Sequence, residues 1–414
     1  MMLLSRTGRA WGRRLAKLTA AQTMSFSGPL GAVPNRAPPQ TAPLTTTTTT
    51  TAAAAAAAVN PRQHERLVEE EEDDRQLEEF FISQLSSIDS DSAALTVPNL
   101  IRQVRDKSGK VVEPNVATLP HEPIPHPNRR VDVPTRAKLL DDDENEDDDG
   151  VVVVAHVVVG RDRRTVSVSS GFAIGVPASN QIGSIVLTCC HPLDDVDRHL
   201  KESTTTPFDS ATLILTSRGD TYTVDSVLSS LPNSDLVLLS LSKNPLPLSS
   251  SPSLSSLRPL ETNTKEHGHH ELRSLAINPY PASTETTTIS TRSYVNPFVR
   301  LRRRRRLAAR ARDQDRDRDR EWTELGRIVE YRDSIGRKLA EPGTQDEDLA
   351  LFTMTTIPTQ GSSGGPVVDV ETGTVVGVTR GSTHKYGDRT AYGFATPAER
   401  ILDMFSLPGF SLAT

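Results

Sequence analysis

From Val151 to the end of the chain, short runs rich in Val, Leu, Ile and Thr alternate with turn residues. The predicted strands of the first half are Val151–Val159, Thr165–Val176, Ser184–Thr188, Ala211–Thr216, Thr221–Leu228 and Leu236–Leu241. Those of the second half are Leu272–Ile277, Thr286–Tyr294, Arg327–Tyr331, Leu349–Ile357, Val367–Val370, Thr374–Thr379 and Ala391–Ala395. No long helical pattern interrupts them, and only Pro397–Phe405 has helical spacing. The pattern predicts an all-β fold built from barrels.

The loop Gly361-Ser362-Ser363-Gly364-Gly365-Pro366 lies between two of these predicted strands. Glycine allows positive φ and close backbone approach, so the Ser363 hydroxyl can project while neighbouring N–H groups point at one spot. A nucleophilic serine with an oxyanion hole requires this arrangement. Taken alone, the same residues also suit a surface hairpin of Gly and Ser.

A serine nucleophile needs a base, and the best candidate is His191, which directly follows an apolar strand. The imidazole in turn needs a carboxylate to fix its tautomer and to stabilise the imidazolium. Asp235 fits because it directly precedes the apolar run Leu236–Leu239. Asp220 and Asp225 are weaker rivals. We expect His191 Nε2 to lie within hydrogen-bond reach of Ser363 Oγ, with Asp235 near the other ring nitrogen.

Four motifs occur in order along the chain: Gly171-Phe172, Leu187-Thr188-Cys189-Cys190-His191, Ser234-Asp235-Leu236-Val237-Leu238-Leu239 and Gly361-Ser362-Ser363-Gly364-Gly365-Pro366. In these motifs the sequence resembles the trypsin/chymotrypsin-like serine peptidases, and most closely their intracellular HtrA-like branch. Ala276-Ile277-Asn278-Pro279-Tyr280 and Gly393-Phe394-Ala395-Thr396-Pro397 also look like HtrA-type segments. The resemblance covers about residues 151–405.

This resemblance implies two six-stranded antiparallel barrels with an active site between them. His191 and Asp235 would come from the first barrel, and Ser363 from the second. The N–H groups of Gly361 and Ser363 would form the oxyanion hole. A substrate pocket would be lined by Ile357, Thr379 and Gly393. Neither a metal nor a cofactor is implied.

Several residues depart from the family pattern. Cys189-Cys190 stands where Ala-Ala is usual before the histidine, and Ser362 replaces the aspartate that digestive members pair with a freed N-terminus. Ile357 stands six residues before Ser363, where trypsin-like members carry a pocket aspartate. We therefore expect no activation by N-terminal trimming, and a preference for small or medium apolar side chains. No room for a PDZ domain is expected after the second barrel.

Composition limits how much of the 414-residue chain can be globular. Aromatic residues make up only 4%, which favours one globular unit of about 200–250 residues plus tails. Cys189 and Cys190 are adjacent, so no disulfide framework is expected, and a reducing compartment fits better than secretion. No apolar run approaches the ~20 residues of a membrane-spanning helix.

The N-terminal region divides into two parts of opposite charge. Residues 1–60 contain no Asp or Glu, and Arg and Lys lie among apolar residues at helical spacing, as in a mitochondrial presequence; a disordered basic tail is the alternative. Residues 61–150 are expected to be an acidic, largely disordered linker. Within it, Leu77, Phe80, Phe81 and Leu85 predict a short amphipathic helix that docks on the globular part or on a partner.

The expected domain limits follow from these segments: a first barrel at 151–245, a linker at 246–265 and a second barrel at 266–412. An Arg-rich insertion at 300–320 is expected to be an exposed loop. Its basic cluster Arg302–Arg306 leaves open a nucleic-acid patch or a nuclear import signal, but there is almost no aromatic interleaving for base stacking.

The leading functional hypothesis is a serine endopeptidase acting on polypeptides, with protein quality control in mitochondria as one role. The alternative is a catalytically inactive peptidase fold that serves as a peptide-binding scaffold. Nucleic-acid binding through the Arg-rich insertion is a third and weaker hypothesis. The nucleus and the cytoplasm are the alternative locations. The sequence does not predict the natural substrate or the oligomeric state.

Overall fold

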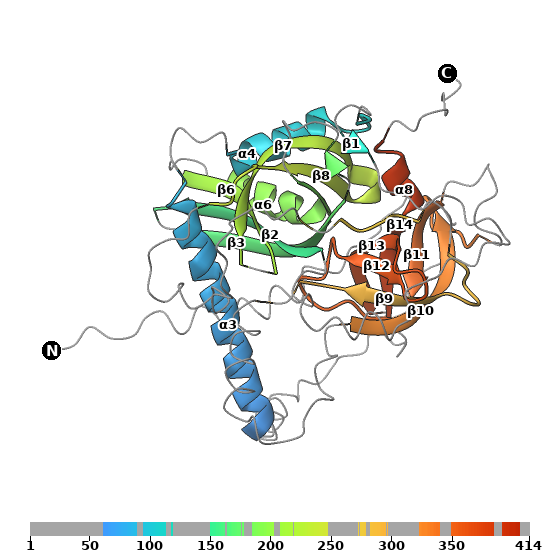
Figure 1. The fold of residues 1–414 in the computed structure, drawn as a ribbon. Coiled ribbons are helices and arrows are strands. Elements are labelled where there is room, and N and C mark those ends of the chain that lie inside the picture. Colours follow the sequence, from blue (N-terminus) through green and yellow to red (C-terminus); the bar gives the residue numbers. More distant parts are fainter. Residues whose placement is uncertain are drawn as a thin grey trace, which may run out of the picture. The chain divides into compact units, whose positions relative to one another are not determined.

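Two closed barrels form the body of the computed structural model (Figure 1). The structure describes residues 61–88, 94–112, 117–118, 150–161, 164–174, 176–177, 184–202, 208–217, 219–246, 272, 274–278, 282–294, 296, 323–339, 349–384 and 391–405. The predicted basic leader, the acidic run before the first barrel and the Arg-rich insertion lie outside the described residues. Among the described helices, none is both long and apolar enough to cross a bilayer.

The first barrel has the closed strand order β2-β3-β5-β8-β7-β6, and every neighbouring pair is antiparallel. Its strands are β2 (Val151–Gly160), β3 (Arg164–Ala173), β5 (Ile185–Thr188), β6 (Phe208–Leu215), β7 (Thr221–Leu231) and β8 (Leu236–Leu241). β1 (Ala117–Thr118) and β4 (Val176–Pro177) form a separate two-stranded sheet.

The second barrel has the closed order β10-β11-β14-β13-β12-β9, again with antiparallel neighbours. Its strands are β9 (Thr288–Arg292), β10 (Thr323–Asp333), β11 (Leu349–Met354), β12 (Pro366–Asp369), β13 (Val375–His384) and β14 (Ala391–Pro397). Tyr331 and Phe352 are buried in its core and meet edge to face, with ring centroids 5.6 Å apart. The prediction of two six-stranded antiparallel barrels is confirmed.

The sequence of strand β2 is a nearly unbroken apolar run, without the alternation of apolar and polar residues that a strand with one exposed face shows. Val152 and Val154 belong to the apolar cluster inside the first barrel, while Val153 and Val157 belong to a second cluster on its outer face. That outer cluster includes Leu77, Phe80 and Phe81 of helix α3 (Pro61–Leu85). Because both faces of β2 are covered, both can be apolar. The predicted amphipathic helix therefore docks on the barrel, and it is longer than the sequence suggested.

Two helices were not expected from the sequence. Helix α4 (Val97–Asp106) buries Leu100, Ile101 and Val104 in the apolar cluster of the first barrel. Helix α6 (His191–Glu202) begins directly at the predicted base. The apolar residues of α4 do follow helical spacing, but a helix of ten or twelve residues is marginal by itself, and tertiary packing stabilises both helices.

Two further predictions need correction. Of the predicted strand 272–277, the described residues form only an isolated bridge between Ile277 and Val375. The helical spacing at 397–405 yields only the single turn α8 (Glu399–Leu402). Ile401 of this turn is buried in an apolar cluster that contains residues of both barrels, among them Phe172, Leu238 and Val378. The C-terminal turn therefore helps to close the seam between the barrels.

His156 in the middle of β2 is buried, and its Nδ1 lies 2.9 Å from Thr212 Oγ1. Burial lowers the pKa of His156 to about 3. The unfolded chain therefore binds one proton more than the folded chain between about pH 3 and the ordinary histidine pKa near 6.5, and stability falls as the pH drops through this window.

We predict that His156→Gln removes this dependence. The free energy of unfolding of the wild type, measured in urea, should fall between pH 7 and pH 5 by about 2 kcal/mol more than that of the variant. Other titrating groups cancel in the difference between the two proteins. Equal pH dependence in both would contradict the assignment.

Candidate active site

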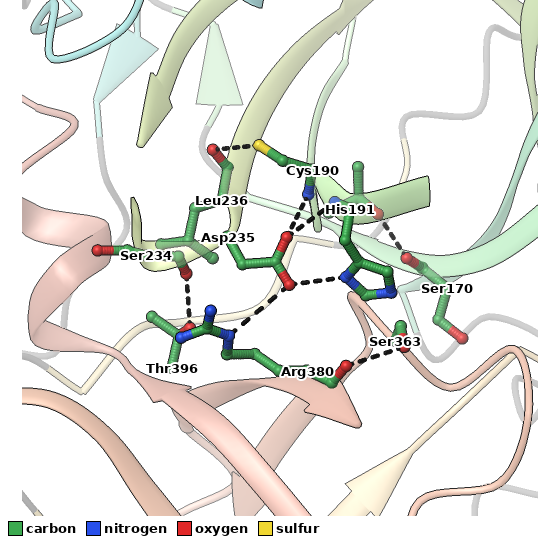
Figure 2. A network of polar contacts seen from close by, with 10 residues as sticks. Ser170, Cys190, His191, Ser234, Asp235, Leu236, Ser363, Arg380 and Thr396 are labelled. Carbon is green, nitrogen blue, oxygen red and sulfur yellow. Dashed lines mark hydrogen bonds and ion pairs between the residues drawn. The ribbon is translucent and has the colours of Figure 1, made fainter. Parts of the chain in front are cut away.

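His191 and Asp235 meet at one end of the first barrel, where β5 ends and β8 begins. These strands are antiparallel neighbours, with Thr188 opposite Val237, so the residues just beyond Thr188 and just before Leu236 are brought together. His191 Nδ1 lies 2.7 Å from Asp235 Oδ2 (Figure 2). The backbone N–H groups of Cys190 and His191 both donate to Asp235 Oδ1, each over 2.9 Å. The carboxylate thus holds both the ring and the first turn of α6.

The backbone at Asp235 is unusual. After the short helix η2 (Pro232–Ser234), Asp235 has φ 58° and ψ 39°, and among the described residues it is the one non-glycine residue with positive φ. Aspartate tolerates the left-handed region better than most residues, and such conformations are found at functional sites when the surroundings enforce them. Here the three hydrogen bonds to the buried carboxylate supply that enforcement.

The electrostatics of His191 are set by burial and by two neighbours. Burial of the ring lowers its pKa, whereas the Cys189 sulfur and the Asp235 carboxylate raise it, and the net result is a raised pKa for His191. Burial also raises the pKa of Cys189, so this residue remains a thiol near neutral pH. The Asp235 carboxylate is therefore the charge that stabilises the imidazolium at neutral pH.

The loop that carries Ser363 presses against the first barrel. Gly364 has φ +84°, and a Cβ there would lie 2.3 Å from the Ser170 carbonyl oxygen and 2.5 Å from Thr188 Oγ1, so no other residue fits without a shift. The Ser170 N–H donates to the Ser363 carbonyl oxygen over 2.8 Å. The loop of the second barrel is thereby fixed next to the strand end that leads to His191.

The expected hydrogen bond between His191 Nε2 and Ser363 Oγ is not formed between these two described residues. The Ser363 hydroxyl instead donates to the Arg380 carbonyl oxygen over 3.1 Å. In Figure 2 the imidazole extends from Asp235 toward the loop that carries Ser363. A serine hydroxyl bonds to whichever acceptor its rotamer reaches, and the sequence does not encode that rotamer.

The N–H groups of the serine loop divide into two sets. Those of Ser362, Gly364 and Gly365 donate to the carbonyl oxygens of Thr359, Thr379 and Ser362. Those of Gly361 and Ser363 have no hydrogen-bond partner within the part of the chain that the structure describes. These are the two N–H groups that the family resemblance assigned to the oxyanion hole.

The three predicted pocket residues lie on or next to the neighbouring strands β11, β14 and β13. Ile357 follows β11 and is 40% exposed, whereas Thr379 on β13 is fully buried. A Cβ at Gly393 on β14 would lie 2.4 Å from the Thr356 carbonyl oxygen, so β14 packs closely against the segment that carries Ile357. Thr379 supports the serine loop through its backbone, because its N–H donates to Gly365 O and its carbonyl accepts from Gly364.

Sequence reasoning missed two residues that bridge the barrels here. Ser170 Oγ donates to the Gly361 carbonyl oxygen over 2.7 Å and accepts from the Tyr294 N–H over 3.0 Å. Arg380 Nε lies 3.7 Å from Asp235 Oδ2. Neither residue has a spacing signal in the sequence, because its role depends on a contact with the other barrel. No group of three metal-ligating side chains occurs among the described residues.

Comparison with known proteins supports the family assignment. Residues 169–378 match the family described as trypsin-like peptidase domain. No curated protein sequence matches the chain.

Among solved structures, the protein is similar to two inactive forms of Rv3671c. One is the Rv3671c protein of M. tuberculosis H37Rv with its serine mutated to alanine: 16% identity, 62% of this chain and 84% of that chain covered, TM-score 0.31. The other is titled Rv3671c protease: 17% identity, 62% and 88% covered, TM-score 0.32. The match to residues 169–378 spans half of the chain and includes His191, Asp235 and Ser363, and the chain therefore belongs to the trypsin-like peptidase family.

Proposed function

We propose that this peptidase is a serine endopeptidase in which Ser363 is the nucleophile, His191 the general base and Asp235 the carboxylate that orients the base. The observation that carries the proposal is the bonded His191–Asp235 pair next to a serine loop in which two N–H groups have no partner among the described residues. Nucleophile, base, orienting carboxylate and oxyanion donors are the four parts that acyl transfer by serine requires.

The first chemical step begins with a rotation of the Ser363 side chain. Its hydroxyl must leave the Arg380 carbonyl, to which it donates at rest, and turn toward His191 Nε2. His191 then accepts the proton as Ser363 Oγ attacks the scissile carbonyl carbon, while Asp235 holds the proton on Nδ1.

The N–H groups of Gly361 and Ser363 stabilise the oxyanion of the tetrahedral intermediate. Loss of one such donor in related chemistry costs about 10²–10³-fold in rate. His191 next gives its proton to the leaving amine, and an acyl-enzyme remains on Ser363. Water activated by the same imidazole hydrolyses this ester and restores the enzyme.

Substrate preference would be set near Ile357. An aliphatic side chain at this position offers no charge to Lys or Arg, so we propose that small or medium apolar side chains are preferred. The partly exposed side chain of Ile357 is compatible with contact to a substrate.

The second candidate function is an inactive peptidase fold that binds peptides. One observation favours it, namely the Ser363 hydroxyl bonded to the Arg380 carbonyl rather than to the base. The two candidates differ in whether Ser363 reacts with a serine-directed probe.

We predict that a fluorophosphonate probe labels the wild-type protein and that Ser363→Ala abolishes labelling and peptide hydrolysis. Ser362→Ala is the matched control, because Ser362 is the adjacent serine and its hydroxyl donates to Thr359 O instead. It should keep the labelling. Absence of labelling in the folded wild type, or labelling that survives Ser363→Ala, would favour the binding protein.

We further predict that Asp235→Asn lowers kcat/KM by about 10³–10⁴-fold, because an amide neither fixes the required tautomer nor stabilises the imidazolium. The carboxylate raises the pKa of His191, and the base works only when neutral, so wild-type kcat/KM rises with pH as His191 loses its proton. The residual activity of Asp235→Asn should rise at lower pH than that of the wild type. Asp225→Asn changes the rival carboxylate on β7, and it should leave the pH dependence of kcat/KM unchanged.

We also propose that residues 1–60 direct the protein to mitochondria, where it would serve protein quality control. The support is compositional, namely basic residues among apolar ones without a single acid. Residues 1–60 fused to a fluorescent protein should reach mitochondria, and replacement of Arg9, Arg13 and Arg14 by Glu should stop import. A nuclear or cytoplasmic wild-type fusion would refute the proposal.

A further inference from the structure

In Figure 2, dashed lines join Arg380 both to Asp235 and to Ser363. Its carbonyl oxygen accepts from the Ser363 hydroxyl over 3.1 Å. Its Nε lies 3.7 Å from Asp235 Oδ2, the same oxygen that meets His191 Nδ1 at 2.7 Å. The side chain of Arg380 is 25% exposed and that of Asp235 7%, so solvent screens this contact only in part.

A bulge in β13 explains how a residue of the second barrel reaches a carboxylate of the first. Thr379 pairs with Ala395 and Gly381 with Phe394, so Arg380 has no opposite residue on β14. Gly381 has φ +151°, a conformation that favours glycine. A bulge of this kind re-aims a side chain, and bulges are over-represented next to active sites.

The contact between Arg380 and Asp235 is electrostatic. At 3.7 Å it is an ion pair but exceeds hydrogen-bond length, and the lone pairs of Asp235 Oδ1 already accept two backbone N–H groups. A guanidinium beside Oδ2 offsets part of the negative charge that the imidazolium would otherwise feel.

We propose that Arg380 is a positioning residue of the active site, which holds the resting Ser363 hydroxyl through its carbonyl and shares Asp235 with His191 through its guanidinium, so that the imidazole stays neutral at lower pH. The proposal rests on the proposed serine-peptidase function. In this role Arg380 has two opposite effects. It keeps more of His191 in the neutral form that can accept the Ser363 proton, and it weakens the stabilisation of the imidazolium once His191 is protonated.

The other groups that face His191 and Asp235 do not replace this charge. Cys189 and Cys190, which precede α6, are buried thiols with raised pKa values. Asp194 on α6 also has a raised pKa, owing first to burial and then to the charge of Asp235. Of the groups that act on His191 or Asp235 within the described residues, Arg380 is therefore the cation that can oppose protonation of the ring.

The test is the titration of the His191 ring by NMR in the wild type, Arg380→Gln and Arg380→Lys, with His191→Gln used to assign the signal. Removal of the charge in Arg380→Gln should raise the midpoint by roughly one pH unit. Arg380→Lys should restore the wild-type midpoint to within a few tenths of a unit, because a point charge suffices. Arg337→Gln removes an arginine that pairs with Asp333 elsewhere in the second barrel, and it should change nothing.

The same variants should move the acid limb of the kcat/KM profile. The kcat/KM of Arg380→Gln should be about tenfold below that of the wild type at pH values below the wild-type midpoint, and nearly equal to it at pH values well above the midpoint. A general loss of packing does not produce this pattern. Arg380→Met keeps the aliphatic stem and serves where Arg380→Gln does not fold. An unchanged or lowered midpoint in the neutral variants, or a lysine variant that behaves like them, would overturn the proposal.

The titration does not require turnover, so the two proposals fail separately. A shifted midpoint in a protein that no fluorophosphonate labels would refute only the serine-peptidase function. Labelling at Ser363 with an unshifted midpoint would refute only the role of Arg380.

Discussion

The carboxylate of Asp235 is the group on which the arrangement of the site depends. A buried charge is costly unless hydrogen bonds and opposite charges compensate for it. Asp235 receives that compensation from the backbone of Cys190 and His191, from the imidazole and from Arg380. Three features of the fold supply this compensation: the turn before β8, which carries the carboxylate, the start of α6, which donates its N–H groups, and the bulge of β13, which directs Arg380 toward Asp235.

The contacts that join the two barrels lie close to Asp235 and Ser363. An apolar cluster shared by both barrels lies in the seam, and it includes Phe172 and Leu238 of the first barrel and Val378 of the second. Polar bonds accompany it, from the Ser170 N–H to the Ser363 carbonyl oxygen and from Thr396 Oγ1 to the Ser234 carbonyl oxygen. Residues next to Asp235 and Ser363 therefore also join the two barrels.

In this seam the His191 ring is bonded to Asp235, while the Ser363 hydroxyl is bonded to the Arg380 carbonyl oxygen. The N–H groups of Gly361 and Ser363 have no partner among the described residues. The proposed mechanism requires a rotation of the Ser363 side chain toward His191. A rotation of that kind is fast, so the resting hydrogen bond is compatible with catalysis, although it is also what the inactive candidate would show.

The strand pattern of the sequence by itself determined an all-β barrel fold and made Asp235 the best carboxylate partner for His191, while the family resemblance implied two barrels of six strands. Strand runs with turn signals are local, and residues flanking two adjacent antiparallel strands must meet wherever those strands pair. The apolar run of β2 was also readable, although only the docking of α3 on its outer face explains why it does not alternate.

Only the tertiary structure decided the direction of the Ser363 hydroxyl, the contact of Arg380 with Asp235 and the helices α4 and α6. Each of these depends on atoms far away in the chain: a carbonyl on β13, a carboxylate in the other barrel, or an apolar barrel face that stabilises a helix too short to form alone. Local pattern carries no information about such partners, because the energy that selects them appears only once the barrels are packed together.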